Sequence, residues 1–173
     1  MTPYPAKLER RETIPGFGEV LLRPVRSDDA PAIERFFARL SPEDVHTRFF
    51  SAMPRLSAAH MARLTGIDFD RDMALLLVEP ASGEILAVGR LCANPDVEHE
   101  EFAITVRTDV KRHSLGEHLM TWLLDYAKGH GTREVFGDIL ADNRPSLALA
   151  RKLGFKLGRR IDSPGIVRAT LQF

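Results

Sequence analysis

One stretch constrains the fold of this chain more than any other, because a strand, a basic loop and a helix follow one another directly. The apolar run 102–106 predicts a strand, and the apolar stripe over residues 115–127 predicts a helix. Lys111 and Arg112 lie in the loop between them. A helix N-terminus offers unpaired backbone N–H groups and the positive end of the helix dipole, which favour a phosphate. The unit therefore predicts an anion site where the helix begins.

The rest of the chain predicts a mixed α/β (α+β) fold. Residues 1–18 contain three prolines and two glycines, and we expect an arm without regular structure. Residues 19–173 show no linker or repeat, and we expect a single domain. Apolar runs predict strands at 20–25, 73–79, 85–91, 100–106, 134–140, 155–160 and 166–171. Capping residues and apolar spacing predict helices after Ser27, Asp28 and Asp29, and over about 42–50, 57–64, 115–127 and 144–153.

Composition narrows the class of protein. The chain has 173 residues, of which 28% are charged, and its formal net charge is zero. A neutral balance argues against a protein that mainly grips a nucleic-acid backbone. The apolar runs are too short to span a membrane, so we expect no membrane partner. The single cysteine, Cys92, has no partner for an internal disulfide, which is typical of a reducing, cytoplasmic setting.

Three local patterns resemble the GNAT (GCN5-related N-acetyltransferase) superfamily. The loop Lys111-Arg-His-Ser-Leu-Gly116 is similar to the family's pyrophosphate loop, with Lys111 in place of the usual Gln or Arg and Ser114 in place of the first Gly. The segment from Asn143 to Leu-Gly-Phe155 is similar to the family's Asn-started helix, and Leu-Arg-Pro-Val25 is a common opening. The resemblance implies a mixed, mostly antiparallel central sheet of about six to seven strands flanked by helices.

Further phrases resemble the acetyltransferase domain of bacterial Pat-type protein lysine acetyltransferases. They are Leu40-Ser-Pro-Glu-Asp44, Arg48-Phe-Phe50, the segment 64–74 and Glu101-Phe-Ala103. This resemblance covers nearly the whole stretch from Val20 to Phe155. It implies acetyl transfer from acetyl-CoA to an amine, with a protein lysine as the acceptor.

The resemblance also assigns site residues. Glu101 matches the family's strand-borne glutamate and is the expected general base. The expected cofactor-binding residues are those of the strand end, the loop, the helix start and the last motif helix: Ile104, Thr105, Val106, Lys111, Arg112, His113, Ser114, Leu115, Gly116, Glu117 and Asn143. No metal is expected, because the six histidines do not form metal-ligand spacing. Many family members carry a Tyr on the last motif helix where this chain has Ala150.

Two interpretations of local features stay open in the sequence. Ser114-Leu-Gly-Glu117 also spells a capping box, in which Ser114 Oγ would bond the Glu117 N–H and remove one donor from the anion site. The acids Asp96, Glu98, Glu100 and Glu101 are either a solvated strand start or a cluster that attracts a cationic acceptor.

The function also has alternatives. The acceptor is either a protein lysine or a small amine such as a polyamine or aminoglycoside. Ser114 and the missing Tyr motivate a different class, a non-catalytic acyl-CoA-binding module, and a purely structural partner protein is a third. The oligomeric state and the acyl chain preference do not follow from the sequence.

Overall fold

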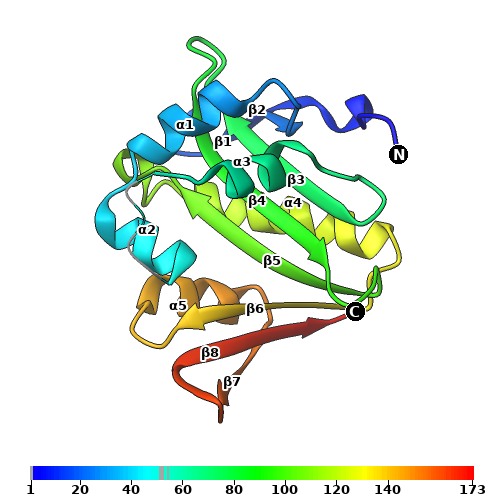
Figure 1. The fold of residues 1–173 in the computed structure, drawn as a ribbon, viewed down its shortest axis with the longest axis vertical. Coiled ribbons are helices and arrows are strands. Elements are labelled where there is room, and N and C mark those ends of the chain that lie inside the picture. The colour runs from blue at the N-terminus through cyan, green and yellow to red at the C-terminus, as the bar shows by residue number, and fades with distance from the viewer. Residues whose placement is uncertain (1, 51–52, 54) are drawn as a thin grey trace.

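A computed structural model describes residues 2–50, 53 and 55–173, and in this part of the chain eight strands form one sheet (Figure 1). Their order is β1-β2-β3-β4-β5-β6-β8-β7. Neighbouring strands are antiparallel except for the parallel pair β5–β6. The strands are β1 (Arg10–Ile14), β2 (Gly18–Pro24), β3 (Asp72–Val78), β4 (Ile85–Ala93), β5 (His99–Val106), β6 (Glu134–Leu140), β7 (Lys156–Arg160) and β8 (Ser163–Gln172).

Five α-helices and two short 3-10 helices connect these strands within the described residues. They are η1 (Ala6–Leu8), α1 (Ala30–Ala38), α2 (Pro42–Phe49), α3 (Ala58–Thr65), η2 (Thr108–Val110), α4 (Leu115–Gly129) and α5 (Arg144–Lys152). Helices α1 and α3 lie on one face of the sheet and α4 on the other (Figure 1). The predicted class, a mixed and mostly antiparallel sheet flanked by helices, is confirmed, although eight strands exceed the expected six to seven.

The sheet separates two apolar cores. The larger core packs α4 and α5 against one face, with Leu119, Leu123 and Leu147 among its buried residues. Helix α4 can approach β4 closely because Gly89 has no side chain, and a Cβ there would come within 2.6 Å of Leu123 Cδ1. The smaller core packs Ile33 and other apolar residues of α1 and α3 against the opposite face of β2, β3 and β4. Since α4 connects two parallel neighbours, it forms the crossover that such a pair requires.

The prediction of an irregular arm over residues 1–18 is wrong for its second half. Residues Arg10–Ile14 form β1, which pairs antiparallel with β2 through a turn that contains Gly16 at φ 79°. Ile14 is buried against the larger core, whereas the rest of β1 is mainly exposed. Strand formation here depends on pairing with β2, and one apolar residue is too weak a local signal to predict it. Met1 of the arm lies outside the described residues.

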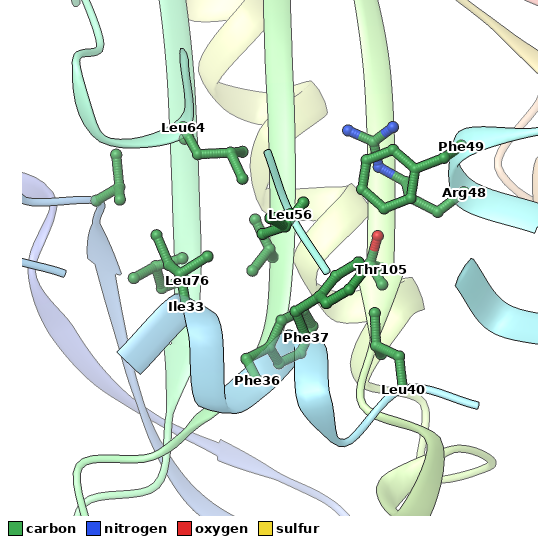
Figure 2. Close-up of a pocket in the computed structure, with 13 residues that line it drawn as sticks. Ile33, Phe36, Phe37, Leu40, Arg48, Phe49, Leu56, Leu64, Leu76 and Thr105 are labelled. Carbon is green, nitrogen blue, oxygen red and sulfur yellow. The ribbon is translucent and has the colours of Figure 1, made fainter. Parts of the chain in front are cut away.

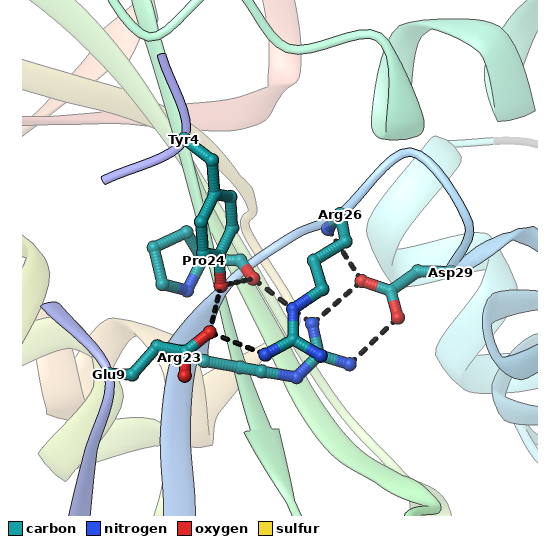
Figure 3. A network of polar contacts seen from close by, with 6 residues as sticks. All are labelled: Tyr4, Glu9, Arg23, Pro24, Arg26 and Asp29. Carbon is teal, nitrogen blue, oxygen red and sulfur yellow. Dashed lines mark hydrogen bonds and ion pairs between the residues drawn. The ribbon is translucent and has the colours of Figure 1, made fainter. Parts of the chain in front are cut away.

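A polar network fixes the N-terminal segment against the junction between β2 and α1 (Figure 3). Tyr4 donates its hydroxyl to Glu9 at 2.6 Å, and the buried guanidinium of Arg23 donates to both carboxylate oxygens of Asp29 at 2.7 and 2.8 Å. Asp29 also accepts the backbone N–H of Arg26 at 2.6 Å. The predicted capping role of Asp29 is therefore wrong, because its side chain makes no cap bond to α1 and pairs with Arg23 instead. Ser41 does cap α2, accepting the Asp44 N–H at 3.1 Å.

Candidate active site

The site begins where the two parallel strands separate. Strands β5 and β6 pair at only three positions, ending with Glu101 opposite Phe136. Beyond that point β5 continues to Val106 and β6 to Leu140 without pairing to each other, and Figure 1 shows the two strands diverging. An open gap between neighbouring strands leaves backbone donors and acceptors free for a ligand.

The backbone direction along β5 shows which groups face this gap. The Arg107 N–H bonds Leu86 O on β4, and His99 O accepts the Asn94 N–H from the same side. Backbone N–H and C=O groups alternate sides along a strand. Those of the odd-numbered residues of β5 therefore point to β4, and those of the even-numbered residues point away from it. The N–H groups of Ile104 and Val106 therefore face the gap, whereas the Thr105 N–H faces β4. The Thr105 side chain lies on the face covered by α1 and α2.

The loop from η2 to α4 adopts a conformation that exposes backbone donors. Arg112 and Ser114 both have left-handed backbone geometry, with φ of 68° and 63°. Ser114 is the N-cap residue of α4, yet its side chain makes no cap hydrogen bond. The capping-box interpretation is therefore wrong, and Glu117 pairs instead with Lys152 on α5 at 2.8 Å. Within the described chain the N–H groups of Leu115, Gly116 and Glu117 have no backbone acceptor, as expected for the first helical turn.

The two loop cations have different surroundings. Lys111 forms an ion pair with the buried Asp44 of α2, which also accepts the hydroxyl of Thr108. Arg112 is exposed, and no ion pair of Arg112 occurs in the described part of the chain. The ring of His113 lies 5.5 Å from that of Phe17, between the centroids, so the β1–β2 turn contacts the loop. Arg112 is therefore the loop cation that remains available to an anion. No local sequence pattern predicts that Asp44 engages Lys111.

The acidic residues around the start of β5 do not form one cluster. Glu100 points to the α4 face, where it is buried and accepts the hydroxyl of Thr132 at 2.7 Å. Burial raises the pKa of Glu100, and the Thr132 hydroxyl partly offsets that rise. Asp96 pairs with His99 at 2.8 Å, and Glu98 pairs with Arg133 at 3.3 Å. The interpretation of these acids as one cluster is thus not supported, because strand alternation sends Glu100 and Glu101 to opposite faces, and the two acids before β5 are paired with His99 and Arg133.

Glu101 is the member of this segment that faces α2. Its carboxylate accepts a hydrogen bond from the Asn94 amide at 3.2 Å and makes no ion pair within the described residues. Arg48, on α2, lies on the same face and stacks its guanidinium over Phe49 at 4.8 Å from the ring centroid. Burial and the nearby charge of Arg90 lower the pKa of Arg48, whereas Glu101 acts in the opposite direction. The Nε of Arg90 on β4 is buried and has no hydrogen-bond partner in the described structure. The sequence did not single out Arg90.

A small apolar cavity lies on this same face, with a volume of about 40 Å³ (Figure 2). Thr105 of β5 and Arg48 of α2 supply its polar lining. The remaining lining is apolar and comes from three helices, β3, β4 and neighbouring loops: Val25, Ile33, Phe36, Phe37, Leu40, Phe49, Leu56, Leu64, Ala74, Leu76 and Val88.

Helix α5 contributes the last predicted residue. Asn143 caps this helix, its Oδ1 accepting the Ser146 N–H at 3.3 Å, and its Nδ2 makes no hydrogen bond within the described residues. Ala150, at the position of the family's Tyr, is buried in the larger core. No cluster of His, Cys, Asp or Glu with the makings of a metal site is found in the described residues. Their helices are also too short or too polar to cross a membrane.

A splayed parallel pair, free N–H groups at a helix start and a basic loop together offer backbone donors and positive charge that suit an anionic ligand. Residues 19–156 match the family model described as Acetyltransferase (GNAT) domain. The chain belongs to this family of acetyl-CoA-dependent N-acetyltransferases.

Relatives and neighbours agree with this assignment. Acetyltransferase PA5475 of Pseudomonas aeruginosa is 34% identical over 143 residues, which are 82% of this chain and 76% of that protein. The GNAT domain of S. lividans PAT superposes with a TM-score of 0.91 at 25% identity, covering 99% of this chain and 100% of that one. The structure of yncA from Salmonella typhimurium with its cofactor acetyl-CoA superposes with a TM-score of 0.69 at 17% identity, covering 88% of this chain and 93% of that one, and it shows a shared fold.

Proposed function

We propose that this protein transfers the acetyl group of acetyl-CoA to the side-chain amine of a protein lysine, with Glu101 as the general base. One observation carries the proposal: among the acids of residues 96–101, Glu101 alone lies on the α2 face without a cationic partner in the described structure. That face also holds Thr105, next to the open gap between β5 and β6. The other three carboxylates are buried or paired elsewhere.

The cofactor would lie along the gap. Its pyrophosphate would accept the free N–H groups at the start of α4, reinforced by Arg112 and by the positive end of the helix dipole. His113 and Ser114 contribute backbone of the loop to the same pyrophosphate site. Lys111 belongs to this loop too, and its ion pair with Asp44 holds the loop against α2. The Nδ2 group of Asn143 offers a further donor. The thioester oxygen would accept the Val106 or Ile104 N–H, because these two groups face the gap.

The chemistry follows from the charges. A lysine amine with a pKa of ~10.4 must lose its proton before attack, at a cost of about 4–5 kcal/mol near neutral pH. Glu101 lies four residues before Thr105, which is roughly 13 Å along a strand, so the proton would travel through water. The amine nitrogen then bonds to the thioester carbon, and the N–H groups of β5 stabilise the oxyanion. As the C–S bond breaks, the nitrogen loses its second proton and the CoA thiolate gains one through water, because Ala150 cannot donate one. The proton that Glu101 accepted then returns to solvent.

One observation supports a protein lysine over a small amine. The chain superposes over 99% of its length on the GNAT domain of S. lividans PAT, consistent with the Pat-type phrases in the sequence. A lysine on a protein loop can reach Glu101 from outside.

The test is release of free thiol from acetyl-CoA in the presence of lysine-containing proteins and peptides. Glu101→Gln should lower kcat by about 10²–10⁴, as removal of a general base does, while acetyl-CoA affinity is retained. The matched control is Glu34→Gln, the same change at an exposed residue of α1. Turnover on polyamines or aminoglycosides but not on protein would replace the proposed acceptor with a small amine. Tight acetyl-CoA binding with no turnover on any amine would indicate a non-catalytic acyl-CoA-binding module.

A further inference from the structure

The cavity beside Thr105 points to a second property of the site. We propose that it receives the acyl chain of the donor, so that the enzyme uses propionyl-CoA and butyryl-CoA as well as acetyl-CoA. The inference rests on the proposed position of the thioester against β5. The side chains that would hold the acyl chain lie on the face of the sheet opposite α4.

Position is the first support. The Ile104 and Val106 N–H groups face the gap in which the thioester would lie, and the side chain between them, Thr105, lines the cavity. Figure 2 shows Thr105 and Arg48 at one side of the cavity, and Leu76, Ile33 and Leu64 at the other. Val88, directly opposite Thr105 on β4, lies on the route between the two sides. An acyl chain that starts at the thioester would therefore extend from β5 across β4 toward β3.

Size and polarity are the second support. A water molecule needs roughly 10–15 Å³ of such a cavity, so a volume of about 40 Å³ has room for about three atoms of that size. Among the described residues, the lining is apolar apart from Thr105 and Arg48. A water in the apolar part would lack hydrogen-bond partners, whereas methylene groups would gain burial. The acetyl methyl group alone would leave most of this space empty, while a propionyl or butyryl chain would fill it.

Arg48 limits what else can enter. Its side chain lines the cavity on the same side as Thr105, and its guanidinium is held over the Phe49 ring (Figure 2). A cationic acceptor chain would meet this like charge before it reached the apolar wall, whereas a neutral acyl chain would not.

The test is a calorimetric titration of the full chain with CoA, acetyl-CoA, propionyl-CoA and butyryl-CoA, which requires no acceptor. Burial of one methylene contributes about 0.8 kcal/mol, so affinity should rise about fourfold with each added methylene up to butyryl. Ala74→Leu, which adds bulk to the β3 wall of the cavity, should lower butyryl-CoA affinity more than acetyl-CoA affinity and so abolish the gain with chain length. Ala81→Leu, the same change in the exposed β3–β4 turn, should preserve the whole series.

A second variant keeps the proposal testable if Ala74→Leu does not fold. Leu64→Ala removes atoms from the wall that α3 supplies, and it should shift the preferred chain beyond butyryl, to hexanoyl-CoA. Equal affinity for acetyl-CoA and butyryl-CoA in the native chain would overturn the acyl pocket and leave the proposed acetyl transfer intact. A native preference for butyryl-CoA that neither variant alters would also overturn it. Failure to bind any of the CoA compounds would refute both the pocket and the proposed cofactor site.

Discussion

The ring of Phe102 lies directly over the backbone of Gly137, at the position where β5 and β6 stop pairing. A Cβ at residue 137 would come within 2.5–2.8 Å of three atoms of that ring. Phe155 packs edge-on against the same ring with centroids 5.3 Å apart, so the ring cannot easily move away. The last paired residues, Glu101 and Phe136, immediately precede these two. A bulky side chain on one strand and a glycine on the other thus mark the point where the cofactor gap opens.

Gly137→Ala should therefore disturb both stability and cofactor binding. Overpacking at a site with no room to relax costs about 1–3 kcal/mol in the free energy of unfolding, and a shifted Phe102 should weaken acetyl-CoA binding. Urea denaturation and calorimetric titration measure the two effects. Gly158→Ala, on β7 where a new Cβ meets no atom within 4 Å, is the matched control. Phe102→Leu in the Gly137→Ala background should restore part of the stability, and absence of any such rescue would contradict the steric explanation.

Arg112 and Lys111 should differ in their contribution to cofactor binding. Arg112→Ala removes an exposed cation with no ion pair in the described residues and should lower CoA affinity by about 1 kcal/mol or more, less so at high salt. Lys111→Ala removes a cation that is already paired with Asp44, so its effect on CoA affinity should be smaller. Titrations at two salt concentrations compare the variants directly. A larger loss for Lys111→Ala would show that the cofactor draws Lys111 away from Asp44.

Ser114→Gly should be tolerated or beneficial. A non-glycine residue at φ 63° carries backbone strain of roughly 1–2 kcal/mol, and glycine relieves it. Part of that gain is lost to the greater freedom of glycine in the unfolded chain, so the expected stabilisation is at most about 1 kcal/mol. Because Ser114 makes no cap bond, its loss should leave CoA affinity equal or higher. A marked loss of CoA affinity would indicate that the hydroxyl itself contacts the cofactor.

Glu100 should make the fold more stable in mild acid than at neutral pH. Its pKa is raised by burial, so the folded state binds the Glu100 proton more tightly than the unfolded state does. This contribution is present below the unfolded pKa and is lost as pH rises through the folded pKa. Glu100→Gln, which can still accept from Thr132, should raise stability at pH 7, and its advantage should shrink as pH falls. Glu98→Gln, at an exposed pair, should change stability by less than about 0.5 kcal/mol.

Much of the fold could be predicted from local sequence because the signals there are strong. The strand 134–140 and the helix starting at Leu115 were predicted at their observed positions, since apolar periodicity and turn residues agree. Strand β1 escaped prediction because its one buried residue, Ile14, gives almost no pattern. The ion pair of Asp29 with Arg23 was not predicted either. An Asp just before a helix is typical of an N-cap, and only the position of Arg23 in the fold shows that Asp29 is an ion-pair partner.

The candidate site divides in the same way. The sequence by itself placed a basic loop before a helix, a strand before that loop and a carboxylate at Glu101, because these features are local and follow the chain. Only the tertiary structure decided which carboxylates share a face, that Asp44 engages Lys111, and that Ser114 is left-handed and makes no side-chain cap bond. It also decided that β5 and β6 separate after three pairs, since that depends on Phe102 and Gly137, which are 35 positions apart in the chain. Contacts of this kind depend on packing between residues far apart in the chain, and local sequence patterns do not predict them.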